Sequence, residues 1–241
     1  MSPLRLKTGP VALFGAIMLV ALIALLPLRL ALGWFDLDNS RIAARAATGS
    51  IWWGSLREVQ VGPIGLGDLD ASLSPWPLFV GRARIDLASP DADASRALRG
   101  GISVSRHTIG IDDITAHLPS GDAFAPLPIA AIDLDDVSAR FVDAKCDAAE
   151  GRVKALLDGD IAGIGLGQSL SGSARCDGGA LLLPLASQAG TEQIALRLWP
   201  TGQFRAELAV KPSDAGAAQK LELAGFRPSP RGYLLTVEGK F

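Results

Sequence analysis

Apolar and polar residues alternate along much of this chain, and turn residues interrupt the alternation at short intervals. Successive side chains of a strand point to opposite faces, so this period of two is typical of strands with one wet face. The segments expected to be strands are residues 56–61, 69–73, 83–87, 102–118, 132–142, 170–175, 180–185, 194–198, 204–210, 220–223 and 233–237. We therefore predict a mainly β chain of about ten or more short strands in an open or curved antiparallel sheet or meander.

Details of the strand pattern give further expectations. Residues 102–118 are predicted to form a strand pair that turns at Gly110, and residues 132–142 a strand with a bulge at Asp135 and Asp136. A brief Ala-rich helix is expected at residues 38–47. The only other segment with the 3.6-residue spacing of apolar residues typical of a helix is residues 151–157.

The N-terminus carries a long uncharged segment. Residues 11–28 contain no charged residue and, as a helix, reach about 27 Å, near the thickness of the hydrocarbon core. Arg29 follows this segment, and Trp34 and Phe35 lie where an interfacial aromatic belt falls. We therefore predict a transmembrane signal anchor at residues 11–33, a cytoplasmic tail at 1–10 and a periplasmic β-rich domain at 34–241. The expected location is the cell inner membrane, crossed once.

Two other interpretations of this segment stay open. Residues 31–33 form a small-x-small cleavage site, so the segment can be a cleaved signal peptide, although its apolar stretch is longer than usual. It can also be a buried helix of a soluble protein. In the first two interpretations, everything after Gly33 is exported.

Composition excludes several classes of function. Lys and Arg number 23 against 25 Asp and Glu, so the chain lacks the basic excess of a nucleic-acid-binding domain. Two Cys and two His are too few for zinc fingers, iron–sulfur clusters or multi-histidine metal sites. We expect no nucleic-acid partner and no cofactor.

The chain has no recognisable catalytic motif. His107 and His117 are ten residues apart, and two neutral ligands bind a metal weakly, so ordinary polar strand positions are favoured. Asp133 and Asp135 are expected on one solvated strand face. Because no nucleophile stands beside a base, we predict that the protein is not an enzyme.

A short glycine-rich sequence occurs twice. Residues 64–67 and 164–167 both read Ile-Gly-Leu-Gly, which favours either a duplicated meander or chance in a chain rich in Gly and Leu. A nucleotide-binding loop is not supported, because no Lys-Ser or Lys-Thr pair follows and no helix is expected there.

Cys146 and Cys176 are the only two cysteines. If this part of the chain is exported, it meets an oxidising compartment, where two lone cysteines usually pair. We predict a disulfide between them, with two buried free thiols as the alternative.

Three tryptophans stand in unusual local sequences. Trp52 and Trp53 are adjacent, so on a strand they would face opposite sides, and Pro75 and Pro77 exclude a central strand around Trp76. We predict that Trp52, Trp53 and Trp76 contribute a contact to a partner or to lipid, with core packing as the other interpretation.

On these segments the chain resembles protein N of the bacterial type II secretion system. Residues 48–54 are similar to the family's Gly-x-x-Trp-x-Gly stretch, and residues 73–81 to a Trp-centred segment after the second strand. The block from Cys146 to Cys176, with residues 170–172 and 176–179, carries the rest of the likeness. The resemblance implies a non-catalytic component of the machine that exports folded proteins across the outer membrane. Its implied neighbours are the inner-membrane platform and the outer-membrane secretin.

Two functional hypotheses of different classes remain. The first is an accessory or scaffold component of type II secretion that binds other components through sheet edges and exposed aromatic residues, and contacts inner-membrane lipid. The second is a membrane-tethered periplasmic lipid-binding or lipid-transfer protein, in which the apolar face of the sheet cradles acyl chains. An envelope hydrolase is the weakest idea, because it needs a nucleophile and a base that the sequence does not reveal.

Overall fold

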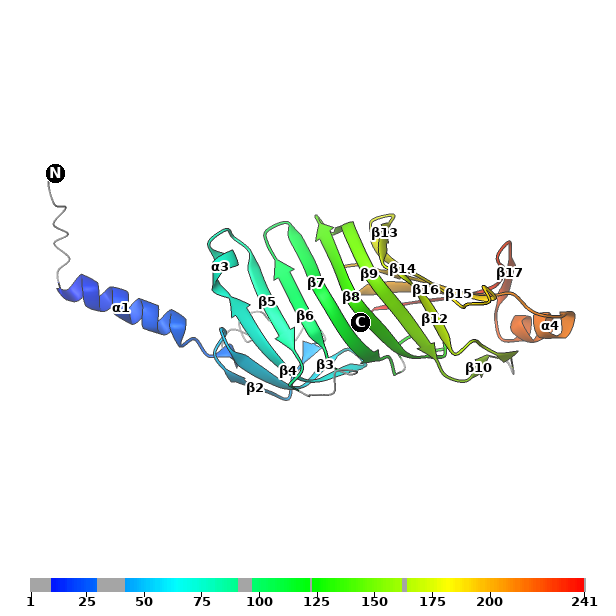
Figure 1. The fold of residues 1–241 in the computed structure, drawn as a ribbon, viewed down its shortest axis with the longest axis horizontal. Coiled ribbons are helices and arrows are strands. Elements are labelled where there is room, and N and C mark those ends of the chain that lie inside the picture. The colour runs from blue at the N-terminus through cyan, green and yellow to red at the C-terminus, as the bar shows by residue number, and fades with distance from the viewer. Residues whose placement is uncertain (1–9, 30–41, 91–96, 122, 162–163, 241) are drawn as a thin grey trace.

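The computed structural model describes residues 10–29, 42–90, 97–121, 123–161 and 164–240 (Figure 1). Its helices are α1 (Pro10–Ala24), α3 (Pro75–Leu78) and α4 (Ala215–Leu223). Its strands are β1 (Ile42–Ala43), β2 (Ala46–Gly49), β3 (Gly54–Val61), β4 (Ile64–Ser74), β5 (Ala83–Ala88), β6 (Arg99–Val104), β7 (Thr108–Pro119), β8 (Ile129–Val142), β9 (Lys145–Leu157), β10 (Asp160–Ile161), β11 (Ile164–Gly165), β12 (Ser169–Ser173), β13 (Arg175–Asp177), β14 (Ala180–Ala186), β15 (Glu192–Leu198), β16 (Gln203–Val210), β17 (Arg227–Ser229) and β18 (Gly232–Lys240).

One antiparallel sheet of 16 strands forms the body of the protein. Its order is β1-β3-β4-β5-β6-β7-β8-β9-β12-β14-β15-β16-β18-β17, with β2 on β3 and β13 on β14, and β10 and β11 form a separate pair. Neighbours in this order are mostly neighbours in sequence, as in a meander. The predicted mainly β, open antiparallel sheet is therefore confirmed.

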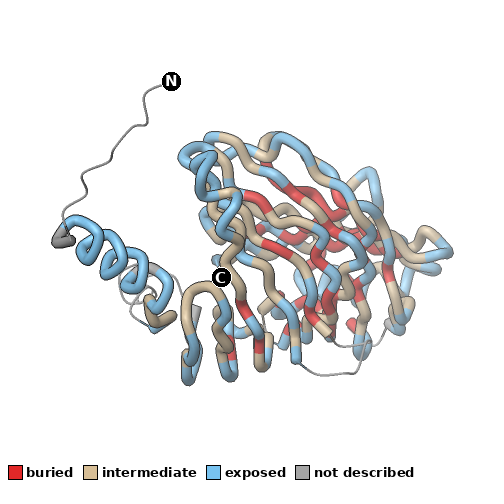
Figure 2. Tube along the Cα trace, turned by 60° about the vertical axis from the view of Figure 1, so that its left-hand side comes forward, coloured by how far each residue is buried: buried red, intermediate tan, exposed pale blue. Residues whose placement is uncertain are grey.

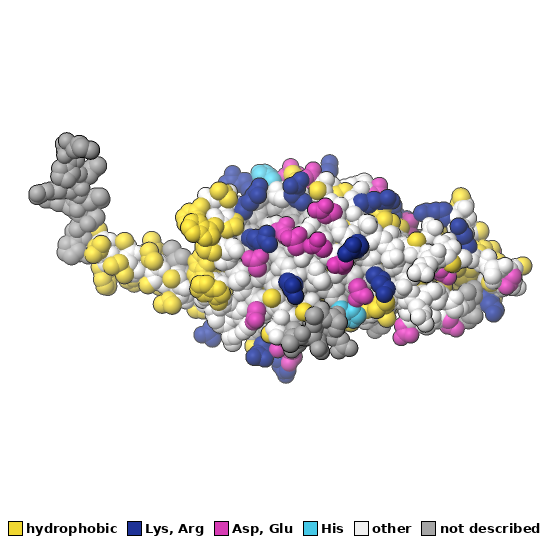
Figure 3. Space-filling view, viewed as in Figure 1, with side chains coloured by type: hydrophobic (Ala, Val, Ile, Leu, Met, Phe, Trp, Pro, Cys, Tyr) yellow, Lys and Arg dark blue, Asp and Glu magenta, His cyan; other side chains and the backbone are white. Residues whose placement is uncertain are grey.

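The register gives the sheet one polar and one apolar face. Ser72 pairs with Asp86 and Asp86 with Gly101, so polar residues share a face that Figure 3 shows over β4–β9. Residues of the opposite face form a core that joins Val137 of β8 to Leu208 of β16. Strands so far apart in the order share one core because the sheet curls over its apolar face, which places β14–β16 behind and beside β9 (Figure 1). Figure 2 shows the buried residues along the middle of the strands.

The predicted helix at residues 38–47 is wrong. Residues 38–41 lie outside the described residues, and the following ones enter β1 and β2, where Ala47 pairs with Leu56. Alanine favours a helix only weakly, and hydrogen bonding to β3 overrides that preference.

The predicted helical period at residues 151–157 is also wrong, because this segment is the second half of β9. It pairs with β8 on one side and β12 on the other, for example Val153 with Leu134 and with Gly172. Gly151 has a φ of +111° and lies against the backbone of Asp136, where β8 shifts register. The predicted bulge at Asp135 and Asp136 is confirmed.

Two further boundaries differ from the expectation. Gly110 lies inside β7, next to Ser103 and Ala139, and the chain turns instead at residues 105–107. Residues 220–223, predicted as a strand, are the end of α4, whose Leu221 is fully buried in the core. Asp214 begins this helix by accepting a hydrogen bond from the Ala217 amide.

The N-terminal segment begins with the 15-residue helix α1. Among the described residues, no helix combines the length and the apolar character that crossing a membrane requires. The cleavage site considered at residues 31–33, and Trp34 and Phe35, lie outside the described residues. The two Ile-Gly-Leu-Gly copies lie in different settings: the first begins β4 in the main sheet, and the second begins β11 in the separate pair.

Candidate functional site

Helix α1 exposes large apolar side chains on all sides. Its residues with 54–69% exposure are Leu13, Phe14, Ile17, Met18, Leu19, Val20 and Leu22. Residues 17–20 are consecutive and cover a full helical turn, so no side of this turn is packed against the described part of the chain. A helix that is apolar all round belongs inside a core or a lipid phase.

A second exposed apolar group lies in the connection between β4 and β5. Trp76, Phe79 and Val80 are 80%, 83% and 75% exposed, and Leu78 between them is also exposed. Pro75 and Pro77 cannot donate to a ladder, so the chain leaves the sheet here and makes the single turn α3. The Trp76 and Phe79 rings lie 6.2 Å apart. Clustered large apolar side chains of this kind mark an interaction surface.

Backbone hydrogen bonds connect α1 to this turn. The Ile51 amide donates to the Leu26 carbonyl just after α1, at 3.1 Å, and the Leu73 amide donates to the Ile51 carbonyl at 3.2 Å. Trp53, which is 79% exposed, follows Ile51 by two residues. We call α1, Trp53 and residues 76–80 together the apolar end. Figure 3 shows hydrophobic side chains of α1 and of the β4–β5 connection at this end of the molecule.

The three tryptophans for which a contact to a partner or to lipid was predicted occupy different environments. Trp52 and Trp53 lie in the turn between β2 and β3 and not on a strand, and Trp52 is half-buried. Trp53 and Trp76 are both exposed at the apolar end. Their contact with a partner or with lipid stays a prediction. The predicted contact did not include Phe79 and Val80, although both lie within residues 73–81, the segment similar to the family's Trp-centred stretch.

A groove of about 750 Å³ begins at Trp53 and crosses the polar face of β4, β5, β6 and β7. Its charged lining residues are Asp70, Arg84, Asp86, Arg99, Asp112 and Asp113. Arg84 donates to Asp86 at 2.8 Å, and this hydrogen bond is the main reason why its pKa is raised. The lining thus carries charges of both signs, with carboxylates in the majority.

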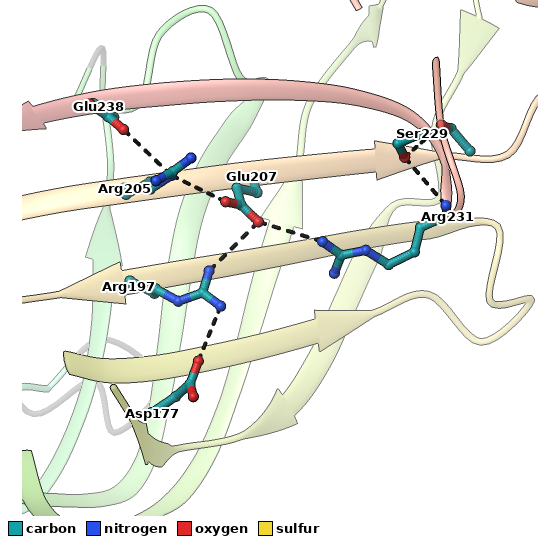
Figure 4. Close-up of polar contacts among 8 residues, drawn as sticks. Asp177, Arg197, Arg205, Glu207, Ser229, Arg231 and Glu238 are labelled. Atoms are coloured by element: carbon teal, nitrogen blue, oxygen red, sulfur yellow. Dashed lines mark hydrogen bonds and ion pairs between the residues drawn. The ribbon is translucent and has the colours of Figure 1, made fainter. Parts of the chain in front are cut away.

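Ion pairs continue the polar face over the C-terminal strands (Figure 4). The Glu207 carboxylate, whose side chain is 13% exposed, lies 3.1 Å from Arg205, 3.6 Å from Arg197 and 3.7 Å from Arg231. Arg197 also pairs with Asp177, and Arg205 with Glu238. Three guanidinium groups face three carboxylates, so the cluster is neutral. The cluster connects β13, β15, β16 and β18.

Each histidine pairs with an aspartate. His107 lies in the turn between β6 and β7, 3.1 Å from Asp143, so its predicted strand position is wrong. His117 lies in β7, 2.6 Å from Asp133 of β8. Within the described ranges, no group of three His, Cys, Asp or Glu side chains is arranged to hold a metal ion.

The structure contains the predicted disulfide between Cys146 of β9 and Cys176 of β13. The two Cα atoms are 5.5 Å apart, and the Cys146 amide donates to the Gly179 carbonyl at 2.8 Å. The bridge and this hydrogen bond connect the start of β9 to the β13–β14 hairpin. The disulfide is therefore a brace of the sheet and not part of the apolar end.

Glu192 is a buried acid at the start of β15, in contact with two loops. Burial acts to raise its pKa, but hydrogen bonds from Ser187, Thr191 and the Gly167 backbone together lower the pKa below its ordinary value of 4.5. The Thr191 hydroxyl donates to Glu192 Oε2 at 2.7 Å. The folded protein therefore favours the ionised form of Glu192.

Glu192→Gln is expected to lower the free energy of unfolding by about 1 kcal/mol at neutral pH, because the amide accepts weaker hydrogen bonds. A lowered folded-state pKa gives stability that is present above the unfolded pKa and lost as the pH falls through the folded pKa. Urea unfolding of both proteins from neutral pH to about pH 3 should show the difference shrinking with acid. A difference that is constant over this range would contradict the prediction.

The fold and the apolar end define a class of protein: a curved, open antiparallel β-sheet with an exposed apolar helix at one end. Residues 40–236 match the family described as type II secretion system (T2SS), protein N. This match covers most of the chain, so the chain belongs to that family, and the resemblance noted in the sequence is confirmed. Neither a curated protein nor a solved structure matches the chain.

Proposed function

We propose that this protein is an accessory or scaffold component of type II secretion that is anchored in the inner membrane and acts by binding. The observation that carries the proposal is the family match over residues 40–236, which links the chain to this secretion system. The polar groove and the ion-paired face supply surfaces for binding other components of the inner-membrane platform or of the outer-membrane secretin.

The proposed topology places residues 1–10 in the cytoplasm, residues 11–33 in the membrane as a single pass, and the sheet in the periplasm. The exposed apolar surface of α1 supports the anchor, because these side chains gain about 25 cal/mol for each Å² removed from water. The disulfide supports the periplasmic location, because disulfides persist in oxidising compartments.

Deletion of the gene is expected to leave folded exoproteins in the periplasm while general export across the inner membrane continues. Restoring the full chain should restore secretion, and a chain with Leu13, Ile17 and Val20 changed to Asp should not, because charges in the anchor prevent its insertion. The control is Leu223→Asp, which puts one carboxylate on an exposed leucine of α4, away from the anchor. The measurement is the exoprotein activity in medium and periplasm, and unchanged secretion after deletion would refute the proposal.

A second candidate is the membrane-tethered lipid-binding or lipid-transfer role. The observation that favours it is an exposed apolar rim, in which Ile85, Val104 and Ile109 lie on the apolar face near the hairpin ends. Such a rim can receive an acyl chain that leaves the bilayer. Native mass spectrometry of the full chain extracted in detergent should then show a stoichiometric phospholipid, and a lipid-free mass would reject this role.

A further inference from the structure

The connection between β4 and β5 carries apolar surface without charge. Residues 75–81 contain no charged side chain, and the first charge after them is the exposed Arg82. The turn is held by hydrogen bonds from the Phe79 amide to the Trp76 carbonyl and from the Arg82 amide to the Pro77 carbonyl. Trp76, Phe79 and Val80 therefore stay outside the sheet on a turn with a defined backbone.

The position of this turn is set by the chain that follows α1. Two successive hydrogen bonds, through Ile51, connect Leu26 to Leu73, two residues before Pro75. Pro27 also forms a bridge with Ser50. The end of α1 and the base of the turn are thus joined by backbone contacts, and α4 lies at the opposite end of the long axis (Figure 1).

We propose that residues 76–80 insert into the interfacial layer of the bilayer in which α1 is anchored, as a second membrane contact. This inference rests on the proposed function, because α1 must first bring the turn to the membrane. A bilayer is the partner that suits this turn. The exposed surface of α1 requires an apolar phase, and backbone hydrogen bonds through Ile51 hold the turn next to the end of α1.

The residue types suit the interface between headgroups and acyl chains. Tryptophan and phenylalanine bury apolar rings at this depth, and the Trp76 indole N–H can still reach a headgroup or water. Arg82, two residues after Val80, is exposed and can pair with anionic headgroups, which attract basic residues near a membrane surface. With α1 and the turn both in contact with lipid, the sheet would be held at one orientation to the membrane and not pivot about a single helix.

The test is quenching of tryptophan fluorescence by lipids brominated near the headgroup, with the full chain in vesicles of phosphatidylethanolamine and phosphatidylglycerol. The reporter is Trp76, with the other tryptophans replaced by Phe. In the same background, Trp76→Phe combined with Leu223→Trp is the matched control, because Leu223 is 83% exposed and lies on α4. A third variant, Trp76→Phe with Leu22→Trp, reports on α1.

We expect brominated lipid to reduce the Trp76 emission roughly twofold and the Leu22→Trp emission at least as much, while the Leu223→Trp emission stays unchanged. Trp76 emission as insensitive as that of Leu223→Trp, with Leu22→Trp quenched, would refute the second contact and leave the anchor intact. An unquenched Leu22→Trp would refute the anchor itself. If the multiple replacement does not fold, the wild type and Trp76→Phe alone are compared, and an equal quenched fraction in both would refute the contact.

Discussion

Replacing Cys146 and Cys176 together with Ser is expected to lower the free energy of unfolding by about 3–4 kcal/mol. The bridge closes a loop across a sequence separation of 30 residues, and without it the unfolded chain gains the entropy of that loop. For a chain of this size the loss corresponds to a fall in melting temperature of roughly 10 °C.

The measurement is thermal unfolding of the full chain in detergent, followed by circular dichroism. Treating the wild type with a reductant should lower its melting temperature toward that of the double variant, whereas the variant should not respond. A wild type that melts at the same temperature with and without reductant, after its thiols are shown to be reduced, would contradict the prediction.

Leu208→Ala is expected to cost about 2–5 kcal/mol, because it opens a cavity in the centre of the main core. Leu208 is fully buried in β16, opposite Ile194 of β15 and Leu235 of β18, and it belongs to the cluster that joins β8 to β16. The neighbouring strands β15 and β18 keep their backbone hydrogen bonds, so the cavity left by the leucine can close only in part.

Leu223→Ala makes the same chemical change at an exposed position of α4 and is the control. Its effect should stay within about 0.5 kcal/mol, since alanine and leucine are both good helix formers. Urea unfolding of the two variants and the wild type measures the difference. Equal midpoints for Leu208→Ala and Leu223→Ala would show that the strands β14–β18 do not form the core described here.

Most strands could be predicted because their pattern is local. The alternation of apolar and polar residues places β3, β5, β15, β16 and β18 correctly, and two prolines correctly exclude a strand around Trp76. The disulfide was predictable because the chain has only two cysteines. The errors arose where a partner strand decides the structure: Ala47 joins a sheet through Leu56, and Leu221 joins the core through a helix.

The candidate site could be predicted only in its parts. The apolar segment that includes α1 and the aromatic residues at positions 53 and 76 are visible in the sequence. Their meeting at one end depends on hydrogen bonds from the Ile51 amide to the Leu26 carbonyl and from the Leu73 amide to the Ile51 carbonyl. Such contacts between distant residues leave no periodic signal. Phe79 and Val80 were missed because an apolar residue after a strand is more often part of a core.

The sequence by itself determined that this chain forms antiparallel strands with one polar and one apolar face, braced by a disulfide and preceded by an apolar helix. Those properties follow from residue types at short spacings, which act within a strand or a turn. Only the tertiary structure decided that the sheet curls until Val137 and Leu208 share a core, and that α1, Trp53 and α3 lie at one end. The physical reason is that the curl of the sheet and the meeting of α1, Trp53 and α3 both depend on the register between strands far apart in the chain. The summed packing of many residues selects that register.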